Sequence, residues 1–403
     1  MKVLMLGWEF PPYHSGGLGI ACYGLTKGLA HQGVEVTFVL PTLKEDIKAE
    51  FVRIIGANRG NITIQSIKSP LSEYMTTRSY AEIMSKKATD STPRLYGPDL
   101  FTEVYRFAKR VEQIAKTEKF DVIHAHDWLT YQAGIYAKKV SGKPLVVHVH
   151  ATEFDRTANN HVNQLVYDIE RTGMHAADSI IAVSNFTKSK IVNKYGINPE
   201  KVNVVHNGCE LKHHKISKEF AIKKTDKVVL FLGRITFQKG PEYFLYMAQK
   251  VLEHIPNVKF VIAGSGDMDQ FIITKAAQMG LGKHVLFTGF LRGADIDRAY
   301  TMADVYVMPS VSEPFGITPL EAMMHQTPVI ISKQSGVSEV VSHCLKVDFW
   351  DIEELANKVV SILRYPSLAA TLTDNADLEL PNFDWDIPAR KCVEVYKTLE
   401  EKW

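Results

Sequence analysis

The sequence predicts an α/β protein made of two consecutive units, each with a parallel β-sheet that carries helices on both faces. Short runs rich in valine, isoleucine and leucine alternate with longer segments of helical periodicity along almost the whole chain. Strands that are buried on both faces of a parallel sheet have this composition. The alternation occurs twice, and a polar, cation-rich stretch at residues 209–226 separates the two rounds. We therefore expect two doubly wound domains joined by a hinge.

The strands and helices follow one another regularly in both units. The first unit is expected at residues 1–208, the second at residues 227–386, and a terminal helix at residues 387–403. First-unit strands are placed at residues 3–6, 34–40, 122–125, 145–149, 180–183 and 202–205, with helices at 19–31 and 100–117. Second-unit strands are placed at residues 228–232, 259–263, 285–287, 305–308 and 329–332. The terminal helix carries Val393, Tyr396 and Leu399 on one side, which predicts that it packs against another element.

Composition and charge exclude several classes of protein. The 403 residues include 47 Lys and Arg against 45 Asp and Glu, so the net charge is +2, and no basic field indicates a nucleic-acid partner. The four cysteines form no Cys-x-x-Cys pair, which argues against a disulfide framework and a zinc knuckle. The N-terminal apolar run is broken at Pro11 and Pro12, unlike a signal sequence. We expect a cytoplasmic protein, with membrane-surface association and oligomeric state left open.

A glycine pair follows the first predicted strand. The loop WEFPPYHSGGLG precedes a helix, and Gly16 and Gly17 allow backbone N–H groups to approach a ligand. A helix N-terminus behind such a loop favours a negative charge, so the loop is a candidate anion site. The alternative interpretation is a plain turn between strand and helix.

Two cations occupy the corresponding place in the second unit. In LFLGRITFQKGPEYF, Arg234 and Lys239 stand just ahead of a helix that begins near Gly240 and Pro241. The helix dipole disfavours cations there unless an anion is held between them. A guanidinium can grip phosphate oxygens in a bidentate manner, and an ammonium acts as a point charge. A pair of solvated surface cations is the alternative.

The segment SVSEPFGITPLEAM contains a third candidate element. Thr318, Pro319 and Glu321 fit a capping box with proline at the first helical position, so we expect a helix to start at Thr318. Glu313 then lies on the loop before the helix, where no capping role explains it, and Gly316 permits close backbone approach. A simple capping role is the alternative for Glu321.

Polar side chains follow three strands of the first unit. Ligands of open α/β sheets bind beyond the carboxyl ends of the strands. These strand ends carry His126 and Asp127 in HAHDW, His148 and His150 in VHVHATEFD, and His206, Asn207 and Gly208 in VVHNG.

A metal site built from these groups is not favoured by the sequence. No histidine pair has the HxxxH spacing of a helix, and we take the two rings of each His-x-His to face opposite sides of the strand. Three Asp-x-Asp triplets could serve a metal-dependent sugar transferase instead. We assign them to structural roles: Asp267 and Asp269, Asp295 and Asp297, Asp384 and Asp386.

Together these motifs resemble the retaining glycosyltransferases of the glycogen and starch synthase type and the related family 4. The most specific matches are GRITFQKG at residues 233–240, which fits the family's GR-x4-KG, and EPFGITPLE at residues 313–321, which fits its E-x7-E. WEFPPYHSGGLG, HAHDW and HNG are supporting matches. The resemblance spans nearly the whole chain and implies the GT-B fold, in which two Rossmann-like domains face each other across a cleft and the last helix crosses back to the first domain.

The resemblance also implies roles for individual residues. Arg234 and Lys239 would neutralise the diphosphate of a nucleotide sugar, with Gly17 and the amides near Gly316, Ile317 and Thr318 as further phosphate contacts. Glu321 would hold the ribose. Glu313 would contact the donor sugar, and His150 would lie by its reacting carbon. The sugar pocket would include Asp127 and Asn207, and Glu9 and His14 would face the acceptor.

The implied reaction moves a hexose, with glucose favoured, from a nucleoside-diphosphate sugar to a glucan, glycoside or other hydroxyl acceptor without a metal or other cofactor. The chain departs from the family at His14, where glucan synthases carry lysine, and at Gln326, where glycine is common. A sugar-nucleotide epimerase of the same fold and a catalytically silent nucleotide-sugar-binding protein are the alternatives. A Rossmann dehydrogenase is disfavoured because the first glycine loop is not GxGxxG.

Overall fold

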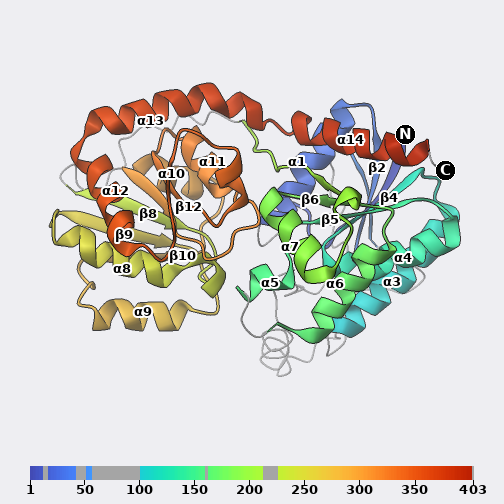
Figure 1. Cartoon of the computed structure of the whole chain (residues 1–403), viewed down its shortest axis with the longest axis horizontal. Coiled ribbons are helices and arrows are strands. Elements are labelled where there is room, and N and C mark those ends of the chain that lie inside the picture. The colour runs from blue at the N-terminus through green and yellow to red at the C-terminus, as the bar shows by residue number, and fades with distance from the viewer. Residues whose placement is uncertain (12–16, 42–50, 57–99, 159–161, 212–225, 402–403) are drawn as a thin grey trace. The chain divides into compact units, whose positions relative to one another are not determined.

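The computed structural model describes residues 1–11, 17–41, 51–56, 100–158, 162–211 and 226–401 (Figure 1). The chain divides into two compact units, and each is described here by itself. Unit 1 contains Met1–Glu153, His161–Gly208 and Trp385–Trp403, and unit 2 contains Phe154–Asn160 and Cys209–Asp384. Residues 212–225 of the expected hinge lie outside the described residues.

Unit 1 contains a seven-stranded sheet in which every strand runs parallel to its neighbours. The strand order is β3-β2-β1-β4-β5-β6-β7. This order reverses direction between β1 and β4, as in a doubly wound fold. The strands are β1 (Lys2–Leu6), β2 (Glu35–Leu40), β3 (Arg53–Gly56), β4 (Val122–His126), β5 (Leu145–Val149), β6 (Ser179–Ala182) and β7 (Val202–Val204).

Helices connect these strands. In unit 1 they are α1 (Gly17–His31), α3 (Leu100–Thr117), α4 (Trp128–Ser141), α6 (Gln164–Ala176), α7 (Asn185–Tyr195), η1 (Pro199–Lys201) and, from the end of the chain, α14 (Asp386–Glu400), whereas all of α5 (Glu153–Arg156) except Glu153 belongs to unit 2. Helix α14 packs against α1 with Cys392, Val395, Tyr396 and Leu399 among its buried residues. The apolar stripe of the terminal helix therefore contacts a helix from the other end of the sequence.

Unit 2 contains a six-stranded parallel sheet of order β10-β9-β8-β11-β12-β13, which reverses direction between β8 and β11. Its strands are β8 (Lys227–Leu232), β9 (Val258–Ala263), β10 (Val285–Gly289), β11 (Val305–Met308), β12 (Val329–Ser332) and β13 (Leu345–Val347). The helices are η3 (Phe237–Lys239), α8 (Pro241–Leu252), α9 (Asp269–Gln278), α10 (Ala294–Met302), α11 (Thr318–Met324), η4 (Gly336–Glu339), α12 (Ile352–Arg364), α13 (Pro366–Glu379) and η5 (Leu380–Phe383). Figure 1 shows the sheet between layers of helices.

The cores explain why these strands form. All five residues of β4 and all five of β5 are buried, as are the four residues of β11 and of β12. Strands buried on both faces remove apolar surface from water along their whole length, which favours a central place in the sheet. The predicted α/β class with two parallel sheets is confirmed, and every predicted strand is present within a residue or two of its expected bounds.

Two strands at sheet edges were not predicted. Strand β3 has the sequence RIIG with partial exposure, and β13 has only three residues, so neither contains a long apolar run. Among the described helices none is both long and apolar enough to cross a membrane.

Candidate functional site

A lysine and a glutamate meet in unit 2 where two loops approach each other. Lys239 ends η3, and Glu313 lies in the loop between β11 and α11. The ammonium Nζ of Lys239 donates a hydrogen bond to Oε2 of Glu313 over 2.5 Å, and the two side chains are 19% and 7% exposed. Ser310 donates a longer bond of 3.3 Å to the same carboxylate oxygen. The two residues that the sequence assigns to diphosphate and sugar are therefore direct neighbours.

Glycine conformation brings these two loops together. Gly240 follows Lys239 with φ of +68°, and a Cβ atom there would lie 2.1 Å from the carbonyl oxygen of Pro309. Gly316 has φ of +98°, and a Cβ atom there would lie 3.1 Å from Cγ of Glu313. Both backbone conformations favour glycine, and the first position also lacks room for any side chain. The glycines of the two motifs thus permit the close contact on which the ion pair depends.

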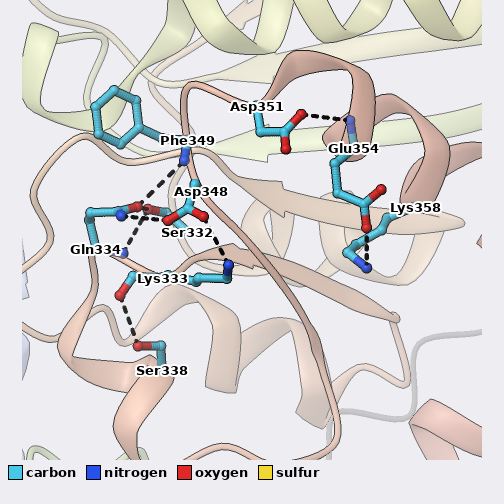
Figure 2. A network of polar contacts seen from close by, with 9 residues as sticks. All are labelled: Ser332, Lys333, Gln334, Ser338, Asp348, Phe349, Asp351, Glu354 and Lys358. Carbon is cyan, nitrogen blue, oxygen red and sulfur yellow. Dashed lines mark hydrogen bonds and ion pairs between the residues drawn. The ribbon is translucent and has the colours of Figure 1, made fainter.

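The backbone of Glu313 is held on both sides by the loop after β12. Its N–H donates to the carbonyl of Gln334, and its own carbonyl accepts from the N–H of Gly336, each over 2.9 Å. The Gln334 side chain is fixed in turn, because it accepts from the hydroxyl of Ser332 over 2.9 Å and donates to Asp348 over 2.8 Å. Figure 2 shows the contacts of the Gln334 side chain with Ser332 and Asp348. Glu313 therefore stands on a backbone with little freedom to move.

Sequence reasoning missed two further contacts of this loop. The carbonyl of Gln238, a buried residue of η3, accepts from the N–H of Val311 over 2.9 Å. The hydroxyl of Ser312 donates to Oδ1 of Asp155 over 2.7 Å, and both side chains are buried. Asp155 comes from α5 and belongs to unit 2 although it lies in the first half of the sequence. No local pattern could reveal a bond between residues 157 positions apart.

The predicted capping box is wrong, although α11 does begin at Thr318. The N-cap is Ile317, one residue earlier than expected, and its side chain makes no capping hydrogen bond. The hydroxyl of Thr318 accepts instead from Tyr306, and the Glu321 carboxylate accepts from Tyr300, each over 2.9 Å. Buried tyrosines need partners for their O–H groups, and they take the oxygens that the capping box would use.

Glu321 therefore has no capping role. Burial raises the pKa of its carboxyl, and the hydrogen bond from Tyr300 acts in the opposite direction. Arg234 is half-buried in the loop after β8, and Gly316 and Ile317 lie in the loop between β11 and α11. The strands β8 and β11 are neighbours in the sheet. Gln326, just after α11, has φ of 58°, a conformation that favours glycine, and its side chain donates to Asp377.

Asp127 is a strained and buried residue in unit 1. It follows β4 with φ of 55° and ψ of 171°, a region that residues other than glycine rarely adopt. Its Oδ1 accepts from the N–H of His150 over 2.7 Å, whereas Oδ2 has no hydrogen-bond partner among the described residues. A buried oxygen with no protein partner, on a strained backbone at a strand end, is typical of a ligand site.

Four histidines form one cluster beside Asp127, which we call the histidine cluster: His124, His126, His148 and His150. The expectation that each His-x-His pair would face opposite sides of its strand is wrong. Residues two apart on a strand share a face, and the rings of each pair stack with centroids 4.4 Å apart on β4 and 4.2 Å apart at β5. Burial lowers the pKa of all four rings, that of His124 to about 3.

The other predicted residues of unit 1 follow strand ends or lie outside the described part. Glu9 is buried just after β1, and Asn207 is half-buried after β7. Gly17 begins α1, where a Cβ atom would meet no heavy atom of the described residues within 4 Å. His14 and Gly16 lie outside the described residues. Because the sheet is parallel throughout, the described strand-end residues share its carboxyl edge with Asp127 and His150.

The three predicted Asp-x-Asp triplets make structural contacts. Asp269 accepts from the N–H of Gly266 over 2.8 Å at the start of α9, and Asp295 pairs with Arg298 within α10. Asp386 lies 2.8 Å from the ring of His31, which joins α14 to α1. Each triplet thus has at least one carboxylate that supports a helix end or a helix contact.

Comparison with known proteins places the chain among sugar transferases. Residues 15–213 match the family described as Glycosyltransferase Family 4, and residues 212–378 match Glycosyl transferases group 1. An uncharacterized glycosyltransferase of Methanocaldococcus jannaschii is 31% identical over 100% of this chain and 99% of its own length. A glycogen synthase of Mycobacterium tuberculosis is 25% identical over 98% of this chain and 94% of its own length.

Solved structures agree on the fold. A sucrose-phosphate synthase from Thermosynechococcus elongatus superposes with a TM-score of 0.76 at 19% identity, covering 100% of both chains. Anabaena HepE, solved in complex with UDP and glucose, superposes with a TM-score of 0.71 at 19% identity, covering 99% of this chain and 100% of its own.

Proposed function

Because the chain belongs to the glycosyltransferases of the GT-B fold and uses nucleotide sugars, we propose that it is a retaining, metal-independent hexosyltransferase. The donor sugar we favour is glucose, and the acceptor is a glucan, a glycoside or another hydroxyl compound. The glycogen synthase relative supports this choice. The observation on which the proposal depends is the Lys239–Glu313 pair beside the start of α8.

The reaction breaks the bond between C1 of the sugar and the diphosphate oxygen. Negative charge develops on that oxygen as the bond stretches, so cations already fixed against it stabilise the transition state more than the ground state. We assign this role to Lys239 and Arg234, with the backbone N–H groups near Gly316 as further donors. These groups supply the positive charge that a divalent metal supplies in other transferases.

Glu313 has the opposite role. Its carboxylate already compensates the charge of Lys239 and is positioned on a rigid backbone, so it is suited to accept hydrogen bonds from hydroxyls of the donor sugar. Glu321 is assigned to the ribose hydroxyls, and Asp127 and His150 to hydroxyls of the sugar. Oδ2 of Asp127 supports that assignment, because it has no hydrogen-bond partner among the residues that the structure describes and a sugar O–H would provide one.

Retention follows if the acceptor hydroxyl attacks C1 from the face that the diphosphate leaves. The new C1–O bond forms to the acceptor oxygen, the old bond passes its electron pair to the diphosphate, and a phosphate oxygen takes the acceptor's proton. We also propose a cytoplasmic location, which the four buried cysteines, all without disulfides, support.

A substrate panel tests the proposal. The protein is incubated with UDP-, ADP- and GDP-sugars and with glucan or simple glycoside acceptors, with and without chelator, and released nucleoside diphosphate is measured. NMR of the product then gives the configuration at C1. We expect transfer that survives chelation and an axial product from an axial donor. Loss of all activity on chelation would refute metal independence, an inverted product would refute retention, and binding without release would indicate a silent sugar-nucleotide-binding protein.

Two variants test the site, and a third provides the control. Lys239→Met removes the charge but keeps much of the side-chain volume, and it should lower kcat on the order of 10²–10³-fold. Glu313→Gln should lower kcat as well. The control is Lys227→Met. It breaks the ion pair between Lys227 and Asp304, which is 3.0 Å long and lies in the same unit at an exposed position. Unchanged turnover in the first two variants would exclude this site.

A further inference from the structure

A direct hydrogen bond joins two rings of the histidine cluster. Nδ1 of His126 lies 2.8 Å from Nε2 of His150, at the carboxyl end of the sheet in unit 1. His126 has no exposed surface, and His150 is 7% exposed. The backbone N–H of His150 is fixed as well, because it donates to Asp127 over 2.7 Å. His150 is therefore held by both its backbone and its ring.

The other nitrogen of each ring has no hydrogen-bond partner in the part of the chain that the structure describes. Nε2 of His126 and Nδ1 of His150 are buried, and neither makes a hydrogen bond to any described residue. Burial keeps both imidazoles neutral, so each carries one N–H and one bare nitrogen. The bond between the rings leaves one N–H and one bare nitrogen unpaired, and its direction decides which ring keeps the unpaired N–H.

The direction of the bond follows from the cost of an unpaired donor. A buried N–H without an acceptor is more costly than a bare nitrogen, and a ligand can satisfy it only where the residue is accessible. Both unpaired nitrogens are covered by protein, but His150 as a whole is 7% exposed and His126 is not exposed at all, so a ligand can reach the ring of His150 with less rearrangement. The favoured arrangement therefore has His126 donating from Nδ1 to Nε2 of His150, which leaves the Nδ1–H of His150 as a donor for a ligand.

A shared metal ion fits the cluster less well. Nitrogens of His124, His126 and His148 lie within 4.8 Å of one another. Their rings, however, are nearly parallel, with interplanar angles of 9° to 27°. Imidazole lone pairs lie in the plane of the ring, so those of stacked rings point along separate parallel planes and do not converge on one ion.

We propose that His126 is a positioning residue that sets the tautomer of His150, so that the Nδ1–H of His150 donates to a hydroxyl of the donor sugar. The inference rests on the proposed function, in which His150 lies beside that sugar. His126 itself does not touch the substrate. A ligand with a hydroxyl oxygen at this position would satisfy the only N–H that the His126–His150 pair leaves unpaired.

Three variants separate positioning from packing. His126→Phe keeps a ring but removes the hydrogen bond, and kcat should fall on the order of ten- to a hundredfold, as expected when a buried polar group loses its partner. His126→Asn places an amide N–H near the position of Nδ1 and should restore most of the activity. His124→Phe makes the same change in the same cluster, but His124 bonds to Tyr396 and His148 and not to His150, so its kcat should match the wild type.

NMR of ¹⁵N-labelled histidine gives a readout that packing alone would not move. In the wild type His150 should be neutral with its proton on Nδ1, and in His126→Phe the two tautomers should mix. A wild-type proton on Nε2 would overturn the inference even if no variant folds. Equal kcat losses in His126→Phe and His124→Phe, or stoichiometric metal in the purified protein, would also overturn it. Unchanged kcat in His150→Ala would instead refute the proposed function of His150.

Discussion

The ammonium of Lys239 lies 2.5 Å from the carboxylate of Glu313, and this pair joins two loops 74 residues apart in the sequence. The pair carries no net charge as long as both groups are ionised. An anion that binds Lys239 therefore approaches a cation whose charge is already compensated. The Glu313 carboxylate thus lowers the affinity of Lys239 for the anion. This relationship allows the two residues to be tested separately.

Removal of the carboxylate should tighten binding of the product while slowing the reaction. Glu313→Gln leaves the Lys239 charge uncompensated, so the Kd of a free nucleoside diphosphate should fall severalfold, while kcat falls because the sugar loses a hydrogen-bond acceptor. Calorimetry gives the Kd and product release gives kcat. Lys239→Met should weaken binding instead. Weaker nucleotide binding in Glu313→Gln would contradict the assigned roles.

Substitution of Asp127 by asparagine should lower the activity without lowering the stability of the fold. Asp127→Asn keeps an oxygen for the His150 N–H but removes a buried charge, one oxygen of which has no partner among the described residues. The free energy of unfolding should stay the same or rise by about 1 kcal/mol, whereas kcat should fall at least tenfold. Urea unfolding and product release measure the two effects. A clear loss of stability would show that the carboxylate is structural.

The histidine cluster should make unit 1 sensitive to acid. Burial lowers the pKa of all four rings below the value of about 6.5 that histidine has in an unfolded chain. Below that pH the unfolded chain binds protons that the folded unit does not, so stability is present at pH 7 and is lost as the pH falls. Each ring contributes a slope of about 1.4 kcal/mol per pH unit.

Hydrogen exchange in β4 and β5 between pH 7 and pH 5 measures this slope for unit 1. His124→Asn removes one of the four rings, one whose folded pKa of about 3 lies well below the tested range. The slope should become shallower by the contribution of one proton. An unchanged slope would mean that His124 is not neutral in the folded unit.

Loss of the Tyr300 hydroxyl should shift the pH dependence of nucleotide binding to higher pH. Its hydroxyl donates to Glu321, which favours the ionised carboxylate and lowers its pKa against the effect of burial. Tyr300→Phe should therefore raise the pKa of Glu321, and nucleotide affinity should be lost at a higher pH as the solution is acidified. Titration of Kd against pH measures the shift. Tyr306→Phe is the matched control, because Tyr306 donates to Thr318, and an equal shift there would refute the role of Glu321.

Periodicity and motifs predicted the fold well because the strands are short, apolar and buried on both faces. They could not predict edge strands such as β13, which have little apolar content. The candidate residues Lys239 and Glu313 were found from their places beside a helix start. The bond from Ser312 to Asp155 was not, because only tertiary structure brings such distant residues together. The shared face of the histidine cluster can be predicted from the sequence, because side chains two residues apart on a strand lie on the same face.

The contact of α14 with α1 has a consequence for the order of folding during synthesis. Unit 1 includes both the first residues of the chain and Trp385–Trp403, and the hydroxyl of Tyr396 bonds to His124 on β4. Unit 1 therefore acquires this helix only after the residues of unit 2 have been synthesised. Until then the surface of α1 that receives this helix is uncovered, and the nascent chain exposes it to aggregation while unit 2 is synthesised.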